Sequence, residues 1–356
     1  VYRSAHSKYG RVCLCGPVVS EDNGIGPTVL LVGVYGVVRI ACNNSDFILK
    51  IMQNKIDILI LNYNGKSLLE SYLGSVVEAA SLASAECGVY VVDNRSSDGS
   101  VEYVRANYPS VKVIVAAENK VLISYNDVVK DLASNIVIFL NNDMSADKGF
   151  IDPLVAEFKD PKVMFAAPRI MNFDGTYNGG RSYMKLSAGA IKVVVDEGNY
   201  MKSGETCAIS TGAFRREMFL ELGGFDDLYL PGIWEDVDIC FRGLIKGYKG
   251  KYVPQSVIYH AESTTFHREY GTSKKMVIAH RNMFLFLWKN IIDKRILLSN
   301  IFLSVPRALF LFLKGNPEIL YGLFAAVWKI KTVMTKRKEW LAGSPLRVMK
   351  DSDLIK

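Results

Sequence analysis

The sequence has few cysteines and no long apolar run. Its six cysteines are scattered through 356 residues without a CxxC pair, which argues against a disulfide scaffold or a zinc ribbon and fits a reducing compartment. No uninterrupted apolar run reaches the ~18 residues of a clean membrane-spanning helix, which argues against an ordinary multi-span membrane protein. The composition, 49% hydrophobic and 22% charged, is that of a globular chain with a full core rather than a disordered one.

Charge is distributed unevenly along the chain. The formal net charge is +7, but residues 268–350 hold 16 Lys and Arg against 4 Asp and Glu, a net of +12. The remainder has 27 basic and 32 acidic residues, a net of −5. A basic region of this kind can meet nucleic acid, anionic lipid or an acidic substrate, and a solvated basic helix face is the plain alternative.

Residues 1–51 differ in pattern from the rest of the chain. They are rich in Gly and Val, contain three of the cysteines and show no clear periodicity. The apolar run at 28–38 is only 11 residues long, its leader is too long for a signal peptide, and no cleavage site stands out. Met52 lies directly before the first well-patterned strand. We therefore expect a native start at Met52 and an N-terminal extension over 1–51 that is non-native or poorly ordered.

From Ile56 onward the chain alternates between strand and helix patterns. Strands are predicted over 56–61, 88–93, 111–116 and 136–140, and helices over 66–86, 101–107 and 125–134. This alternation predicts a parallel α/β sheet covered on both faces, whose ligands bind beyond the carboxyl ends of the strands. Polar clusters follow three of these strands: NYNG at 62–65, DNRSSDGS at 93–100 and NND at 141–143. Three such loops converging on one edge predict a site.

Three later motifs carry acidic or imidazole groups. Asp143 ends the NND turn, where a hard cation would find an oxygen ligand, although Asn and Asp are also ordinary turn residues. Glu235 and Asp236 stand together in WEDVD. Clustered, partly buried carboxylates gain proton affinity and suit general-base work, whereas acids at a helix start also complement the helix dipole. His260 follows a strand pattern, and it matters only because two acidic clusters precede it.

From about residue 56 to 290 the order of these motifs resembles family 2 glycosyltransferases of the GT-A fold, the rhamnosyltransferase-like branch in particular. The resemblance rests on LILNYNG, VVDNRSSDGS, IVIFLNNDM, STGAFRREMFLELGGFDD, WEDVDICFR with GYK, and VIYHAEST. It implies a GT-A catalytic domain over 52–270, with a mostly parallel central sheet flanked by helices. The implied activity is inverting transfer of a sugar, rhamnose by analogy, from a nucleotide-diphosphate sugar to a glycan or lipid-linked acceptor, as in cell-surface polysaccharide or glycolipid synthesis.

The resemblance assigns roles position by position. It implies donor-nucleotide contacts at Asn62, Asn64, Asp93, Asn94 and Asn142, a divalent metal (Mg²⁺ or Mn²⁺) at Asp143 with His260, and a catalytic base at Asp236 beside Glu235. Two departures stand out. The acidic triplet begins with Asn141 and so offers one carboxylate, and the segment 119–126 lacks the glycine-rich stretch of the family. These departures leave open a catalytically weakened homologue that acts as a binding or scaffold subunit.

The C-terminal region, 271–356, contains three apolar, aromatic stretches at 283–288, 301–313 and 321–330 with basic residues around them. Each stretch is shorter than a membrane span. The pattern predicts amphipathic helices lying on an anionic bilayer, on the inner face of the cell membrane and near a polyprenyl-linked acceptor. Burial against the catalytic domain is the alternative.

Two other classes of protein fit less well. Basic residues of the C-terminal region alternate with Leu, Phe and Trp, which does not make a nucleic-acid recognition module. A sugar-1-phosphate nucleotidylyltransferase would want a glycine-rich N-terminal loop with a basic residue, and NYNG lacks that form.

Overall fold

The computed structural model describes residues 4–7, 10–13, 28–33, 36–41, 55–261, 265–343 and 347–356, with side chains over 55–261, 271–343 and 347–356. The chain divides into two units, Val1–Asn54 and Lys55–Lys356. In the first unit, four antiparallel strands form a sheet in chain order: β1 (Ser4–Ser7), β2 (Gly10–Cys13), β3 (Thr28–Gly33) and β4 (Gly36–Ala41). The rest of the expected N-terminal extension, and Met52, lie outside the described residues.

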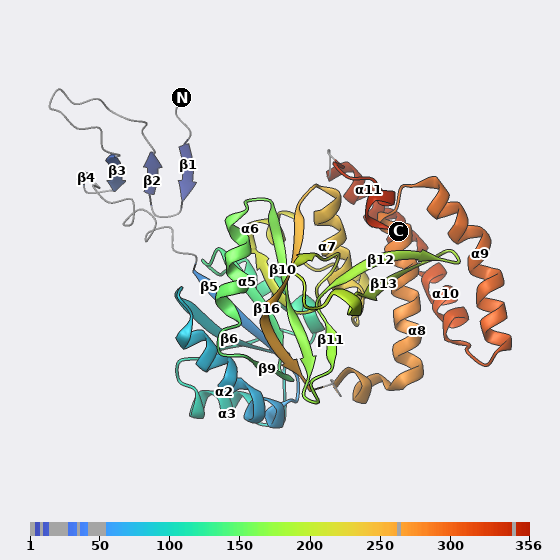
Figure 1. Ribbon diagram of the computed structural model, residues 1–356, viewed down its shortest axis with the longest axis horizontal. Coiled ribbons are helices and arrows are strands. Elements are labelled where there is room, and N and C mark those ends of the chain that lie inside the picture. Colours follow the sequence, from blue (N-terminus) through green and yellow to red (C-terminus); the bar gives the residue numbers. More distant parts are fainter. Residues whose placement is uncertain are drawn as a thin grey trace. The chain divides into compact units, whose positions relative to one another are not determined.

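The second unit is built on a ten-stranded sheet (Figure 1). Its four predicted strands are confirmed and run parallel to one another: β5 (Ile56–Asn62), β6 (Cys87–Asp93), β7 (Lys112–Val115) and β8 (Ile136–Asn141). β5 lies between β6 and β8, which makes it a central strand. Apolar runs form such strands because both faces of the sheet are covered.

The other half of the sheet is mixed. Its strands are β9 (Met144–Ala146), β10 (Val163–Asn172), β11 (Tyr177–Gly179), β14 (Gly204–Glu205), β15 (Gly212–Arg215) and β16 (Lys249–His260). β15 runs antiparallel between β8 and β10, whereas β10 and β16 are parallel. The predicted α/β class is confirmed, with more antiparallel pairing than expected. A separate hairpin joins β12 (Ser182–Ser187) and β13 (Ala190–Val195).

Each face of the sheet has its own core. Ile58 and Leu59 are both fully buried but belong to different clusters, because successive strand residues point to opposite faces. One face is covered by α2 (Lys66–Leu82), α3 (Ser100–Asn107) and α5 (Ile151–Ala156). The other is covered by α4 (Ser124–Val129), α6 (Arg216–Glu221) and α7 (Glu235–Ile245).

The first of the C-terminal helices is α8 (Thr265–Asn290), which is interrupted by non-helical backbone at Gly271. The run from Met283 to Leu287 is at most 5% exposed and packs in the same core as α7. The expectation that this stretch lies on a membrane is therefore wrong: it is core, because a helix buried against a domain and a membrane-facing helix share the same apolar composition.

The helices after α8 are α9 (Lys294–Leu313), α10 (Glu318–Trp328), α11 (Ile330–Gly343) and α12 (Asp351–Leu354). α9 has 20 residues and contains an 18-residue window with a mean hydropathy of 1.9, so by length and composition it could cross a membrane. The expectation that every apolar stretch is shorter than a span is wrong for α9, because helical residues before Ile301 extend it. Large apolar side chains on α9 and α10 are exposed, among them Leu313 at 83% and Trp328 at 91%.

Candidate active site

The ends of three parallel strands hold a polar network. Asn62, which ends β5, donates from Nδ2 to Asp93 Oδ1 at the end of β6 (2.9 Å) and accepts at Oδ1 from Asn142 Nδ2 (2.7 Å). All three side chains are at most 8% exposed. A Cβ at Gly65 would lie 2.1 Å from Asn142 Nδ2, so only glycine allows this close approach of the NYNG turn. The structure thus brings together residues that are far apart in sequence.

Ser96 organises this edge, and sequence reasoning gave it no role. Its Oγ donates to Asp93 Oδ1 (2.6 Å) and accepts from the Asn64 backbone N–H (2.8 Å). Asn64 itself has a left-handed φ of 46° and accepts at Oδ1 from Ser97 N (2.8 Å). The signal for Ser96 was its place in the polar loop after Asp93, whose Oδ2 accepts from the Ser96 backbone N–H (2.8 Å).

Asn94 is held by the loop that lacks glycine. Its Nδ2 donates to Val121 O (3.3 Å) and its Oδ1 accepts from Ser124 Oγ (2.5 Å). Val121 has a φ of 52°, a conformation that glycine adopts freely and that costs a β-branched residue on the order of 1–3 kcal/mol. The loop therefore reaches the end of β6 without glycine, with strain at Val121.

Asp143 and His260 face each other at the neighbouring strand ends. β9 pairs with β16, which sets Asp143, just before β9, beside His260 at the end of β16, with Nε2 and Oδ2 3.4 Å apart. Asp143 Oδ1 and His260 Nε2 are buried without a hydrogen-bond partner. Buried polar atoms without a partner are uncommon in native proteins, and a missing ion is one explanation.

This pair fits a divalent cation. A carboxylate oxygen and an imidazole nitrogen are suitable ligands, and Mg²⁺ commonly takes one or two protein carboxylates and completes its shell with substrate phosphates. Among the residues with described side chains, no group of three or more His, Cys, Asp or Glu could hold an ion. Asp143 and His260 offer only two ligands, so a cation between them would need further ligands from a substrate.

Glu235 and Asp236 open α7 and have raised proton affinity. Burial, together with the charge of Asp236, raises the pKa of Glu235 to about 8, and its Oε2 is buried without a partner. Burial raises the pKa of Asp236 to about 6, although its Oδ1 accepts from Val237 N (2.8 Å). Both carboxyls therefore bind a proton more readily than free ones, Glu235 more strongly than Asp236. In the described part of the chain, neither carboxylate hydrogen bonds to Asn62, Asp93 or Asp143.

A third acid of this motif, Asp238, is structural. It is 0% exposed and accepts hydrogen bonds from four side chains: Arg242 Nε (2.7 Å), Lys289 Nζ (2.9 Å), Tyr229 Oη (2.7 Å) and Asn290 Nδ2 (2.7 Å). Burial alone would raise the pKa of Asp238, but the charges of Lys289 and Arg242 outweigh it and hold the pKa below its ordinary value. Asp238 therefore anchors the first turn of α7.

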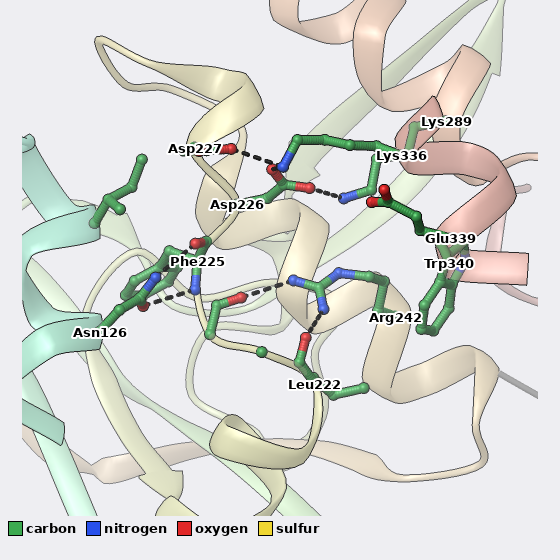
Figure 2. Close-up of a pocket in the computed structure, with 13 residues that line it drawn as sticks. Asn126, Leu222, Phe225, Asp226, Asp227, Arg242, Lys289, Lys336, Glu339 and Trp340 are labelled. Atoms are coloured by element: carbon green, nitrogen blue, oxygen red, sulfur yellow. Dashed lines mark hydrogen bonds and ion pairs between the residues drawn. The ribbon is translucent and has the colours of Figure 1, made fainter. Parts of the chain in front are cut away.

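A pocket of ≈ 460 Å³ lies beside this anchor (Figure 2). None of the nine predicted site residues lines it. Four of its charged side chains are paired with one another: Lys289 Nζ contacts Asp226 Oδ2 (2.5 Å), and Lys336 Nζ contacts both Asp226 Oδ1 and Asp227 Oδ1 (2.7 Å each). These pairs tie α8 and α11 to the GGFDD loop that precedes α7. The pocket wall thus links the C-terminal helices to the segment that leads into α7.

Comparison with known proteins identifies the domain. Residues 57–222 match the family model for glycosyl transferase family 2. These residues are a family 2 glycosyltransferase domain. They include the predicted nucleotide residues and Asp143, whereas Glu235, Asp236 and His260 lie beyond the matched range.

Two curated proteins of Mycobacterium tuberculosis are similar to the chain. A pre-mycofactocin glycosyltransferase is 27% identical over 133 residues, 37% of this chain and 28% of that protein. An N-acetylglucosaminyl-diphospho-decaprenol L-rhamnosyltransferase is 24% identical over 267 residues, 66% of this chain and 85% of that protein. The solved structure of GalNAc-T7 with UDP, GalNAc and Mn²⁺ matches with a TM-score of 0.52 and 20% identity, covering 67% of this chain and 49% of that chain. This likeness concerns the fold, and it confirms the GT-A prediction.

Proposed function

We propose that this protein is an inverting glycosyltransferase that moves a sugar from a nucleotide-diphosphate sugar to a hydroxyl of a glycan or lipid-linked acceptor. The observation that carries the proposal is the continuous polar edge of the sheet. There the buried Asn62–Asp93–Asn142 network runs directly into Asp143, whose Oδ1 has no partner. In an open α/β sheet this edge is where ligands bind.

The donor fits this edge by its chemistry. Amide and carboxylate groups such as those of Asn62, Asn64, Asp93, Asn94 and Asn142 hydrogen bond to base edges and ribose hydroxyls. Asp143 and His260 would hold Mg²⁺ or Mn²⁺ next to them. When bound, the cation offsets the negative charge that develops on the leaving diphosphate.

Asp236 is the proposed base. Its carboxylate takes the proton of the acceptor hydroxyl as that oxygen forms a bond to the anomeric carbon and the bond from that carbon to the diphosphate breaks. Glu235 stays protonated at neutral pH, which keeps a single negative charge on the pair. One displacement without a carboxylate nucleophile inverts the anomeric centre, unlike the double displacement of retaining enzymes. General-base assistance of this kind contributes about 10²–10⁴-fold.

The acceptor side involves a membrane surface in this proposal. Exposed side chains on α9 and α10, such as Phe302 (69%), Leu313 (83%) and Trp328 (91%), leave an apolar face open next to basic residues. Helices with such a face bind anionic bilayers at their cytoplasmic surface. The rhamnosyltransferase relative, 85% of which is covered by the match, bears a name that includes a decaprenol-linked acceptor, and this supports an acceptor of the same class.

Turnover and product stereochemistry test the proposal. The full chain is incubated with UDP-, GDP- and dTDP-sugars, Mn²⁺ or Mg²⁺, and polyprenyl-diphosphate acceptors in anionic vesicles, and the anomeric configuration of the product is read by NMR. We expect one donor to turn over with inversion, and Asp236→Asn to lose about 10²–10⁴-fold in kcat while folding normally. A retained configuration, or full activity of Asp236→Asn, would contradict the mechanism. A folded protein that binds a donor but transfers nothing would favour the binding or scaffold subunit.

A further inference from the structure

We propose that Asn282, on α8, is a positioning residue that holds the backbone turn from which Glu235 and Asp236 project. The catalytic role of those two carboxylates rests on the proposed function, whereas the contacts of Asn282 with the turn are independent of it. Nothing in the family match reaches α8, because that match ends at residue 222.

The turn before α7 is strained. Gly232, Ile233 and Trp234 have positive φ angles of 137°, 70° and 84° in succession. Ile233 is β-branched, and side chains of this type are rare outliers in the left-handed region. Each residue other than glycine in this region costs on the order of 1–3 kcal/mol, and the conformation persists only where surrounding contacts hold it in place. The conformation therefore needs a partner that binds it specifically.

Asn282 is that partner. Its side chain is 0% exposed, and its Nδ2 donates to the carbonyls of Tyr229 (2.8 Å), Gly232 (2.8 Å) and Ile233 (2.7 Å). Its Oδ1 accepts from Arg281 Nε (2.8 Å), which fixes the orientation of the amide. The Asn282 NH₂ has two hydrogens, so one of them is shared between two of the three carbonyls. Because the carbonyls need a donor, this arrangement selects an amide and disfavours a carboxylate or an alkyl group.

The rest of α8 supports the same segment. The ring of Phe286 packs against Trp234 with centroids 5.0 Å apart. Lys289 and Asn290 both bind Asp238 in the first turn of α7 (2.9 and 2.7 Å). One face of α8 thus contacts both the strained turn and the helix start that follows it. The C-terminal region is for this reason part of the geometry around Asp236.

Removal of the amide should act on turnover rather than on donor binding. In Asn282→Ala three buried carbonyls lose their donor, and Ile233 and Trp234 relax toward negative φ. That relaxation rotates the start of α7. A displacement of about 1 Å at a reacting group costs about 10²-fold, so kcat should fall by about that factor. The KM for the donor should stay close to that of the wild type, because the predicted donor contacts lie at the strand ends.

Asn300→Ala is the matched control. Asn300 is 1% exposed. Its Nδ2 donates to Gly189 O (2.7 Å) and Ser304 Oγ (2.8 Å), and its Oδ1 accepts from Trp288 Nε1 on α8 (2.9 Å), with no bond to the turn. Both variants lose a buried amide and should lower the unfolding temperature, but only Asn282→Ala should lose kcat. Wild-type kcat in Asn282→Ala, or an equal loss in Asn300→Ala, would overturn the proposal.

A second readout does not need activity. The emission of Trp234 is isolated as the difference between each protein and its Trp234→Phe partner. We expect Asn282→Ala to shift this emission and Asn300→Ala to leave it unchanged, and an unchanged emission in Asn282→Ala would overturn the proposal. If the wild type transfers no sugar from any donor, the proposed function fails, while the Trp234 signal still decides whether Asn282 holds the turn.

Discussion

Lys289→Met should be among the most destabilising single substitutions in this chain. The Lys289 ammonium is 3% exposed and lies between two carboxylates, Asp226 Oδ2 at 2.5 Å and Asp238 Oδ1 at 2.9 Å. Methionine fills a similar volume without the charge. The substitution therefore tests the ion cluster rather than packing.

The magnitude follows from burial. Removing one partner of a buried ion pair costs about 3–5 kcal/mol, because the remaining charge is left without compensation. Here two carboxylates lose the same cation, although each keeps one other, Lys336 for Asp226 and Arg242 for Asp238. For a unit of this size the loss corresponds to a fall of about 6–10 °C in the unfolding temperature. It is a large share of the roughly 5–15 kcal/mol that stabilises a typical domain.

The loss of stability in Lys289→Met should also depend on pH. In the wild type the charge of Lys289 holds the pKa of Asp226 and of Asp238 below their ordinary values, against the effect of burial. Carboxyls with lowered folded-state pKa values contribute stability above their unfolded pKa and lose it as the pH falls. In Lys289→Met, Asp226 keeps Lys336 and Asp238 keeps Arg242 as partners, but burial is opposed less strongly and the carboxyls take up protons more readily. The deficit relative to the wild type should thus be full near pH 7.5 and smaller near pH 4.5.

Urea unfolding followed by circular dichroism at both pH values measures the effect. Lys130→Met is the matched control, since Lys130 pairs with Asp127 at 2.7 Å with both side chains more than half exposed, and such a surface pair contributes at most about 1 kcal/mol. A loss below about 1 kcal/mol in Lys289→Met, or a deficit that does not shrink in acid, would refute the account of the cluster.

Three further predictions concern the carboxylate pair and the exposed helices. First, because Asp236 must be ionised to act as a base and its pKa is raised to about 6, kcat should rise with pH through an apparent pKa near that value, and a flat profile from pH 5 to 8 would argue against Asp236. Second, folding raises the pKa of Glu235 to about 8, so the wild type loses stability as the pH rises from the unfolded-state pKa of Glu235 toward this value. Glu235→Gln has no such group, and its unfolding temperature relative to the wild type should increase from pH 5 to pH 8.5 in differential scanning fluorimetry; the same temperature difference at both pH values would contradict this. Third, Trp328→Glu together with Phe324→Glu should weaken binding to anionic vesicles in a flotation assay, whereas Leu82→Glu, at an exposed apolar residue of α2, should not.

Much of the sheet could be predicted from the sequence. β5, β6 and β8 are short, nearly continuous apolar runs, a pattern typical of strands buried on both faces. Because parallel strands end at one edge, the polar residues after them could be expected to meet, and Asn62, Asp93 and Asn142 do meet. Their roles in binding a donor stay predictions.

What the sequence could not provide were the contacts between distant segments. β15 is only four residues long and pairs antiparallel with β8, and no periodicity in so short a run indicates its partner. The contacts of Asn282 and Lys289 with residues about 50 positions earlier depend on how α8 packs. The run from Met283 to Leu287 could not be distinguished from a membrane-facing stretch, because composition alone does not say what covers an apolar helix.

Metal-dependent nucleotide binding tests the central claim most directly. UDP, GDP and dTDP are titrated calorimetrically into the full chain with and without Mn²⁺, and into Asp143→Asn, which keeps the shape of the side chain but removes its charge. We predict that one diphosphate binds, that Mn²⁺ tightens its binding, and that Asp143→Asn abolishes the effect of the metal while weaker metal-free binding remains. Binding that is indifferent to Mn²⁺ and to Asp143, or no binding of any of the three by the folded protein, would contradict a nucleotide-sugar site at this edge of the sheet.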